Sequence, residues 1–378
     1  MKTRVLIVGG GFAGASAAAA LAKDDQFKVT LIEEEKVPGV HSSGRNASMA
    51  RRVIEDPLLS KLACMSIEGI RRLEIESGVR LMSAQGGLLI GRSSEIEPLY
   101  RSASVVPELK SDMQLLDRHG LIGKVSVLDE AESDTGIATS ECGVVDIHAL
   151  LSHYFHLART RGAECLTNHR LVAIDTEGGM IKRACVNGSW HDVDVIVNAA
   201  GYAANHISNL AGLSPLPLNP SRRHLFVTSS WTQVEPNWPF VWDISHGLYF
   251  RPESGGLLMC ACDETAWSKG DVPVDETMRQ ILAEKFSAFV PKLTEARPAY
   301  VWAGLRVLTP DGRFIIGEDP RMRGFYWAAG LGGHGMTTSY GVGELVAQAL
   351  TQERSRDDLI EAFSPGRFLK STDKSFAA

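Results

Sequence analysis

Three glycines between short hydrophobic segments constrain the fold of this chain more than any other feature. The segment from Val8 to Gly14 reads Val-Gly-Gly-Gly-Phe-Ala-Gly and fits the pattern G-x-G-x-x-G. The apolar run Arg4–Val8 predicts a strand, the alanine-rich stretch to Ala22 predicts a helix, and Lys28–Ile32 predicts a second strand. This order of strand, helix and strand predicts the start of a doubly wound α/β fold.

Each glycine has its own physical task in such a motif. Gly9 permits the tight turn, Gly11 lets a pyrophosphate approach the backbone, and Gly14 lets the helix pack closely on the strand. Glu33 follows the second strand, where a carboxylate can accept hydrogen bonds from ribose hydroxyls. The motif therefore predicts a bound dinucleotide, either FAD or NAD. The predicted contacts here also include Phe12, Ala13 and Glu34.

A second glycine cluster lies more than 300 residues further along the chain, at Gly330-Leu-Gly-Gly-His-Gly-Met336. It follows a predicted strand, Gly324–Ala329, and opens a predicted helix, Met336–Leu350. Backbone N–H groups at a helix start can stabilise the negative charge of a reduced flavin. A nicotinamide enzyme needs no such cluster, so FAD is favoured over NAD. The alternative is an ordinary strand-to-helix turn.

Composition and charge argue against several other classes of protein. Hydrophobic residues make up 44% and charged residues 22% of the chain, as in soluble globular proteins. The net charge of −6 and the absence of long basic clusters argue against a nucleic-acid partner. No stretch approaches the ~18 apolar residues of a membrane span.

The six dispersed cysteines indicate reduced thiols, and Cys260-x-Cys262 has no second pair to complete a zinc site, so no metal is predicted. The first 22 residues imitate a secretory signal peptide. The glycine motif inside them argues that they are part of the fold, which leaves the cytoplasm as the expected location.

The length of 378 residues predicts two domains. The predicted fold class is α/β, with a Rossmann-like FAD-binding domain assembled from discontinuous segments and an inserted β-rich α+β substrate domain. The FAD-binding domain would comprise residues 1–80, 145–215 and 300–378, and the substrate-binding domain residues 81–144 and 216–299. Further helices are predicted at Pro57–Glu76, Asp146–Arg161 and 275–290.

Motifs along nearly the whole chain resemble the D-amino acid oxidase superfamily of flavoproteins. Besides the N-terminal motif they are His41–Ala47, Val195–Gly201, Trp302–Arg306 with Thr309–Gly312, and Gly332–Gly335. Within the superfamily, four segments most resemble the bacterial D-arginine and D-amino acid dehydrogenases. These segments are His41–Arg45, Arg222-Arg223, Leu248–Pro252 and Trp302–Arg306.

The resemblance implies which residues surround the FAD. Val172 would contact the adenine side. The other implied contacts are Ser42, Ser43, Gly44, Arg45, Asn46, Ala47, Ala200, Gly201, Gly304, Arg306, Gly332, Gly333, His334, Gly335, Met336 and Thr337. Covalent sarcosine oxidases attach the flavin through a cysteine just after the arginine that binds the substrate carboxylate, which corresponds to Arg306 here. Val307, Leu308 and Thr309 stand there in this chain, so a noncovalent FAD is expected.

The carboxylate clamp of the family falls on Arg306, with help from Tyr249 and from Arg222 or Arg223. An arginine can bind a carboxylate with two hydrogen bonds, and a tyrosine hydroxyl adds a third donor. Adjacent residues of a strand point to opposite faces, so only one residue of the arginine pair can reach the site, and which one stays open. The alternatives are a structural ion pair for Arg306 and a core position for Tyr249.

Two departures from the family concern the substrate. His334 replaces a tyrosine of the arginine-preferring relatives, and it would either cover the substrate or lie on a surface loop. Those relatives have an acid in the strand near Gly86-Gly87, where this chain has glycine. A guanidinium substrate is therefore not expected, and a neutral or bulkier side chain could use the vacated space.

The implied activity is FAD-dependent oxidation of the Cα–N bond of an amino acid, with the D-enantiomer expected. Hydride transfer to flavin N5 would give an imino acid and then a 2-oxo acid. The alternatives are an oxidase of N-methylated or cyclic secondary amino acids, a 2-hydroxyacid dehydrogenase, and a flavin-binding subunit without turnover. The expected partners are a small amino acid or related carboxylate, and an electron acceptor that stays open between a quinone, a dye-like acceptor and O2.

Overall fold

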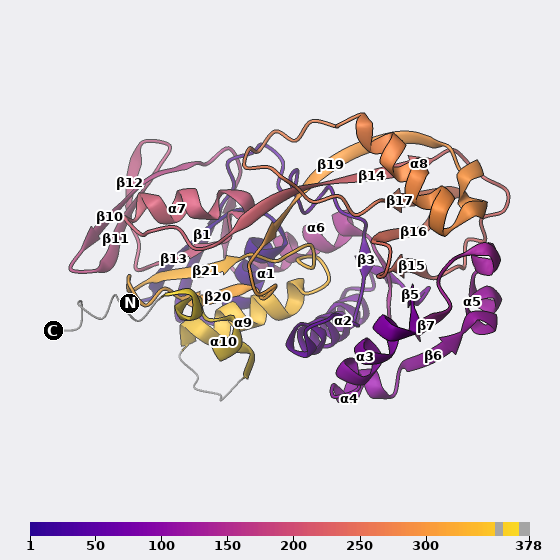
Figure 1. Ribbon diagram of the computed structural model, residues 1–378. Coiled ribbons are helices and arrows are strands. Elements are labelled where there is room, and N and C mark those ends of the chain that lie inside the picture. The colour runs from indigo at the N-terminus through magenta and orange to yellow at the C-terminus, as the bar shows by residue number, and fades with distance from the viewer. Residues whose placement is uncertain (352–357, 370–378) are drawn as a thin grey trace.

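The computed structural model describes residues 1–351 and 358–369, and its first large sheet is mainly parallel (Figure 1). Six strands lie in the order β20-β21-β13-β1-β2-β9. They are β1 (Thr3–Val8), β2 (Phe27–Ile32), β9 (Glu164–Leu166), β13 (Val195–Asn198), β20 (Ile315–Glu318) and β21 (Phe325–Ala329). All neighbours pair in parallel except β20, which runs antiparallel to β21 at one edge. Segments far apart in the sequence thus build one sheet, as expected.

The glycine motif connects β1 to α1 (Phe12–Leu21), as predicted. Every residue of α1 is buried, because α6 (Ile147–Thr160) and α9 (Ser339–Thr351) pack against it. Small residues allow this close packing. A Cβ atom added to Gly343 of α9 would lie only 2.6 Å from the Ser16 carbonyl oxygen of α1.

The second large sheet is mainly antiparallel and contains nine strands. Its order is β18-β14-β17-β16-β15-β5-β7-β6, and β19 also pairs with β14. The strands are β5 (Gly87–Gly91), β6 (Met113–Asp117), β7 (Thr135–Thr139), β14 (Asn219–Thr228), β15 (Phe240–Asp243), β16 (Leu248–Glu253), β17 (Gly256–Cys260), β18 (Thr265–Ala266) and β19 (Pro298–Leu308). Figure 1 shows the long strands β14 and β19 running from the first sheet toward α8 (Thr277–Phe289).

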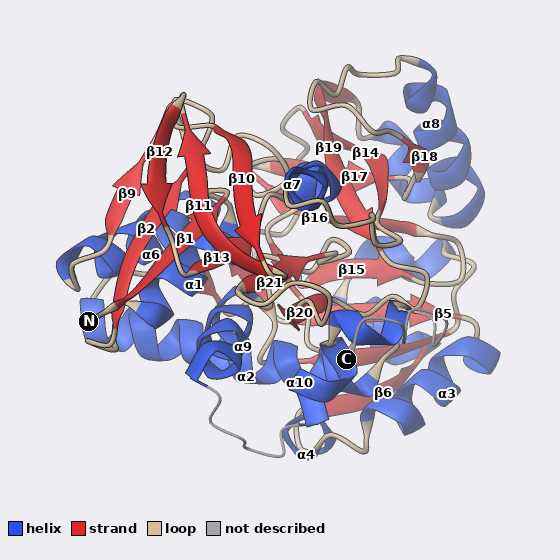
Figure 2. Ribbon diagram, turned by 90° about the vertical axis from the view of Figure 1, so that its left-hand side faces the viewer, coloured by secondary structure: helices blue, strands red, loops and turns tan. Residues whose placement is uncertain are grey.

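Two small sheets complete the strand pairing of the described residues. One is the antiparallel meander of β10 (Leu171–Glu177), β11 (Met180–Val186) and β12 (Ser189–Asp192). Figure 2 shows it beside the first sheet, on the opposite side of the molecule from α8. The other joins β3 (Met49–Ala50), β8 (Gly143–Val145) and β4 (Met82–Ser83).

The α/β fold class is confirmed, while several element boundaries differ from the prediction. The helix predicted at residues 57–76 is α2 (Pro57–Ser77), whereas the last long helix begins at Ser339 instead of Met336 because the glycine cluster continues as turns. Among the helices that were not predicted, three cover the β5–β7 region. They are α3 (Ser93–Ala103), α4 (Pro107–Lys110) and α5 (Arg118–Lys124).

The division into two domains stays a prediction, and the proposed boundary between residues 299 and 300 falls inside β19. Within residues 1–351 and 358–369, no helix is long and apolar enough to cross a membrane.

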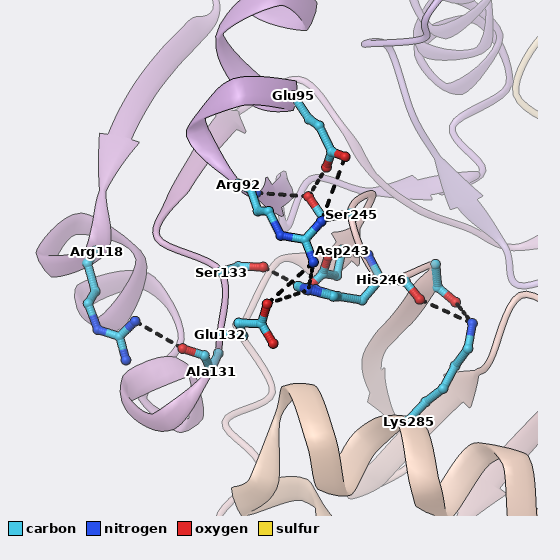
Figure 3. A network of polar contacts seen from close by, with 11 residues as sticks. Arg92, Glu95, Arg118, Ala131, Glu132, Ser133, Asp243, Ser245, His246 and Lys285 are labelled. Atoms are coloured by element: carbon cyan, nitrogen blue, oxygen red, sulfur yellow. Dashed lines mark hydrogen bonds and ion pairs between the residues drawn. The ribbon is translucent and has the colours of Figure 1, made fainter.

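A buried polar network fixes the turn between β15 and β16 (Figure 3). Asp243 is fully buried and accepts hydrogen bonds from Ser133 Oγ at 2.7 Å and from the backbone N–H of His246 at 3.0 Å. The same carboxylate lies 2.8 Å from His246 Nδ1. Lys285 of α8 donates to the carbonyl oxygen of His246 at 3.1 Å. Tyr249 follows this turn directly, so the network fixes the start of the strand that carries it.

We expect Asp243→Ala to destabilise the protein by about 3–5 kcal/mol, because it removes one partner of a buried polar cluster. The Ser133 hydroxyl and the His246 imidazole would lose their acceptor in a place that water does not reach. Chemical denaturation measures the change in unfolding free energy. The control is Glu132→Gln at the half-exposed end of the network, where solvent screens the interaction and little change in unfolding free energy is expected. Equal effects of the two variants would contradict this account of the network.

Candidate active site

One cavity brings together residues from both large sheets, at the carboxyl ends of β1, β2, β13 and β21. This is where open parallel sheets bind their ligands. The predicted site residues that line it are Gly9, Gly11, Phe12, Ala13, Glu33, Glu34, Ser42, Ser43, Arg45, Asn46, Ala47, Ala200, Gly201, Arg223, Tyr249, Gly304, Arg306, Gly332, Gly333, His334, Gly335 and Met336. The predicted residues that do not line it are Gly14, Gly44, Val172, Arg222 and Thr337.

At one end of the cavity the glycine motif leaves backbone exposed where a side chain would not fit. Gly9 has φ of +111°, and a Cβ there would lie 2.5 Å from the Ala199 carbonyl oxygen. A Cβ on Gly11 would lie 2.9 Å from Ser43 Oγ. Gly11, at the N-cap of α1, has no side chain, and the N–H of Phe12 in the first turn donates to Ser43 Oγ at 3.1 Å. The exposed backbone and the other N–H groups of the helix start fit a pyrophosphate.

Glu33 is held in place beside this backbone. Its two carboxylate oxygens accept the N–H of Gly10 at 2.7 Å and the N–H of Glu35 at 2.9 Å. Each oxygen keeps a further lone pair, so the carboxylate can still accept hydrogen bonds from a ribose. This end of the cavity therefore fits the adenosine half of FAD.

The second glycine cluster lines the middle of the cavity. Gly332 and Gly333 have φ of +53° and +89°, which favours glycine at both positions. A Cβ on Gly304 of β19 would lie 2.6 Å from the Arg45 carbonyl oxygen, so β19 passes close to the predicted cofactor segment. No cysteine occurs among the described lining residues, and the noncovalent attachment of the flavin stays a prediction.

At the far end, Arg306 and Tyr249 both carry donors without a protein acceptor. Arg306 is half-buried, and within the described residues no hydrogen bond or ion pair involves its guanidinium. Tyr249 is fully buried, and its hydroxyl has no hydrogen-bond partner in that part of the chain. Burial raises the pKa of Tyr249 well above its usual value, so the hydroxyl stays a donor. A structural ion pair does not account for Arg306.

The register of β14 answers which residue of the arginine pair faces the cavity. Arg222 binds Asp275 at 2.9 Å and stacks on Trp267 at 5.1 Å, away from the cavity. Arg223 lines the cavity, and its Nη1 is buried without a partner among the described residues. Its other nitrogens bind the Asp263 carbonyl oxygen at 2.8 Å and Glu264 at 2.5 Å.

His334 lies at the same end of the cavity instead of on the surface of the loop. Burial, with the positive charges of Arg51 and Arg306, holds the pKa of His334 well below its usual value. The imidazole is therefore neutral at neutral pH.

The sequence did not predict Arg51 or Trp242, and both line this end. Arg51 is 5% exposed and stacks over the Trp242 ring at 4.3 Å from its centroid. The sequence showed Arg51 only as one residue of a basic pair with Arg52, which instead binds Asp112 at 3.0 Å outside the cavity. The sequence could have indicated Arg51 as a site residue, because it lies only four residues after the segment predicted to contact the flavin.

Several predictions need correction. The space beside Gly87 is not vacant, because a Cβ there would lie 2.5 Å from the ring of Phe240. Val172 is 45% exposed at an irregularity between β10 and β11, and His169, Arg170 and Leu171 line the cavity in its place.

The other residues outside the cavity support its walls. A Cβ on Gly14 would lie 1.9 Å from the Gly9 carbonyl oxygen, so Gly14 serves the packing of α1 on β1. A Cβ on Gly44 would lie 2.5 Å from the Gly39 carbonyl oxygen. The hydroxyl of Thr337 donates to the Met49 carbonyl oxygen at 3.2 Å, which ties the second glycine cluster to β3.

Comparison with known proteins gives consistent matches over almost the whole chain. The family model "DAO: FAD dependent oxidoreductase" matches residues 4–349. Monomeric sarcosine oxidase of Bacillus sp. (strain B-0618) is 26% identical, with 96% of this chain and 95% of the relative covered. D-amino acid dehydrogenase of Vibrio vulnificus (strain CMCP6) is 21% identical, with 82% and 75% covered. The crystal structure of L-proline dehydrogenase from P. horikoshii superposes with a TM-score of 0.87 at 23% identity, with 97% and 98% covered.

Proposed function

Because the chain belongs to the DAO family of FAD dependent oxidoreductases, we propose that it oxidises the Cα–N bond of an amino acid whose carboxylate Arg306 binds. The product would be an imino acid, which water converts to a 2-oxo acid. The observation that carries the proposal is the guanidinium of Arg306, which lies in the cavity without a partner among the described residues.

The residues of the cavity fit FAD along its length. Gly9 and Gly11 would hold the pyrophosphate, Glu33 the ribose, and the cluster Gly332–Gly335 the isoalloxazine ring. When bound, FAD accepts the two electrons and the hydrogen that the substrate loses.

The side chains beyond the flavin segment would orient the substrate. Arg306 would bind the carboxylate with two hydrogen bonds, Tyr249 would donate a third, and Arg223 Nη1 lies on the same wall. Glu33 and Glu34 are the acids that line the described cavity, and both belong to its nucleotide end. No carboxylate therefore competes for Arg306, and no carboxylate base is available to the amine. An amine that arrives neutral needs no such base, and alignment of the substrate would supply much of the rate.

The stereochemistry and the degree of N-substitution are finer points of the proposal. The motif resemblance to bacterial D-amino acid dehydrogenases supports a D-amino acid. The relative named a sarcosine oxidase supports the second candidate, an N-methylated or cyclic secondary amino acid bound by the same arginine.

The decisive experiment is a substrate panel on the FAD-loaded protein without oxygen. D- and L-amino acids, N-methyl and cyclic amino acids and 2-hydroxy acids are mixed with the protein, and loss of the flavin absorbance is recorded. Bleaching by a D-amino acid supports the proposal, and bleaching only by secondary amino acids or hydroxy acids supports the corresponding alternative. A protein that cannot be loaded with FAD would refute the proposal. Reoxidation by O2, a quinone or a dye then identifies the class of acceptor.

We expect Tyr249→Phe to lower kcat/KM by about 10- to 100-fold, the effect of losing a hydrogen bond to a charged group. The unfolding free energy should stay equal or rise, because the variant removes a buried hydroxyl that has no partner among the described residues. Steady-state kinetics and chemical denaturation measure the two effects. Lower stability with unchanged kinetics would show that the hydroxyl serves the core and not the substrate.

A further inference from the structure

The substrate end of the cavity carries more positive charge than one carboxylate requires. Three arginines line it, namely Arg51, Arg223 and Arg306. None of the three guanidinium groups is fully hydrogen-bonded within the described chain: Arg51 Nε and Arg223 Nη1 are buried without partners, and Arg306 has no partner there. The acids paired with Arg51 and Arg223 are Glu55 at 3.5 Å and Glu264 at 2.5 Å, whose side chains are 67% and 52% exposed. These acids lie toward solvent and do not line the cavity.

The three arginines form two separate walls. Arg223 pairs with Gly304 and Ser221 pairs with Arg306 across β14 and β19, so Arg223 and Arg306 project from the same face of this ribbon. Arg51 follows β3, a different element of a different sheet, and its guanidinium is stacked on Trp242. One carboxylate held on the β14–β19 wall would leave the Arg51 donor unused.

Leaving that donor unused is unfavourable. The only acid paired with Arg51 in the described chain is Glu55, which lies 3.5 Å away and is largely exposed, so this pair offsets little of the desolvation of Arg51, and the nearby charge of Arg306 adds repulsion. A ligand with two negative groups would satisfy both walls, whereas a neutral side chain would leave Arg51 with Glu55 alone. Trp242 of β15 contacts both Arg51 and Tyr249 of β16, at 4.3 Å and 4.7 Å by ring centroid, so it holds Arg51 near a donor expected to bind the α-carboxylate.

We propose that the substrate carries a second acidic group and that Arg51 binds it, while Arg306 and Tyr249 bind the α-carboxylate. This inference rests on the proposed function. The substrate class is a dicarboxylic amino acid, with the second carboxylate either on the side chain or on an N-carboxymethyl substituent.

The test begins with binding, which does not depend on turnover. Malonate, succinate and glutarate, with propionate, butyrate and pentanoate as the monocarboxylates of equal length, are titrated into the FAD-loaded protein by calorimetry. We expect the best dicarboxylate to bind about 100-fold more tightly than the monocarboxylate of equal length, since a charge-assisted pair is added. Arg51→Met should reduce this ratio to below about 5-fold.

The matched control is Arg52→Met, which removes a neighbouring buried arginine that faces Asp112 instead of the cavity. It should lower thermal stability and leave the ratio of dicarboxylate to monocarboxylate affinity unchanged. Equal binding of both classes by the unmodified protein would overturn the inference. A loss of both classes in Arg51→Met would also overturn it, because Arg51 would then serve the α-carboxylate or the flavin.

Kinetics separate this inference from the proposed function. Aspartate, glutamate and N-(carboxymethyl)glycine are compared with asparagine, glutamine and N-methylglycine as substrates. Reduction of the flavin by both sets at equal kcat/KM would support the proposed amino acid oxidation and overturn the proposal that the substrate carries a second acidic group. Tight dicarboxylate binding without flavin reduction by any amino acid would overturn the proposed function and leave the Arg51 site standing. A preference of about 100-fold for the acids, lost in Arg51→Met, supports both.

Discussion

Arg306→Met is expected to lower kcat/KM for the amino acid substrate by about 30- to 5,000-fold, while the protein keeps its FAD. Loss of one partner of a buried charge pair costs about 2–5 kcal/mol. Transition-state theory converts this free-energy cost into the expected decrease in kcat/KM. The effect should fall mainly on KM, because Arg306 would hold the carboxylate in the ground state as well as in the transition state. Methionine keeps the hydrophobic stem that packs beside Gly333, where a glycine Cβ would lie 2.9 Å from Arg306 Nε.

Two further variants make this measurement specific. Arg306→Lys keeps the charge but loses the two-pronged geometry, so its kcat/KM should lie between those of the unmodified protein and Arg306→Met. Arg222→Met changes a buried arginine on the strand beside β19 that binds Asp275 outside the cavity. It should alter stability and change kcat/KM by less than about threefold. Unchanged kinetics in Arg306→Met, with FAD bound, would remove Arg306 from the substrate site.

The features that the sequence predicted well depend on local backbone geometry. The motif from Gly9 to Gly14 works through contacts within one strand–turn–helix unit, so its spacing alone predicts what each glycine does. The helix α2 was predicted to within one residue because its apolar residues repeat at helical spacing and Asp56 caps its start. The second glycine cluster was recognised for the same reason, because backbone positions with positive φ favour glycine and the cluster is therefore visible in the sequence.

The features that the sequence did not predict depend on which strands lie beside each other. Arg222 and Arg223 differ only in the face of β14 on which they lie, and the register with β19 determines that face. The filling of the space beside Gly87 by Phe240 follows from the pairing of β5 with β15, which are about 150 residues apart in sequence. Arg51 reaches the cavity only because β3 pairs with β8, a contact between distant segments.

A substitution in the glycine motif, at the other end of the cavity, is expected to have an equally large effect, on cofactor binding instead of substrate binding. Gly11→Val is expected to yield a folded protein that does not retain FAD through gel filtration. The nearest obstacle to a side chain at Gly11 is Ser43 Oγ at 2.9 Å, a hydroxyl that can rotate away, so the protein itself can accommodate the change. The valine methyl groups would then occupy the space in which a pyrophosphate must approach the backbone and the start of α1.

Gly14→Val provides the contrast within the same motif. Its Cβ would lie 1.9 Å from the Gly9 carbonyl oxygen, a backbone atom that cannot rotate away, so this variant should fail in folding instead of in cofactor binding alone. Gly123→Ala in α5 is the control, because nothing lies within 4 Å of a Cβ added there. This variant should be stable and retain FAD. The flavin-to-protein absorbance ratio and circular dichroism measure the two losses separately. A Gly11→Val protein that retains stoichiometric FAD would show that the pyrophosphate does not bind at this turn, and the placement of the cofactor would have to be revised.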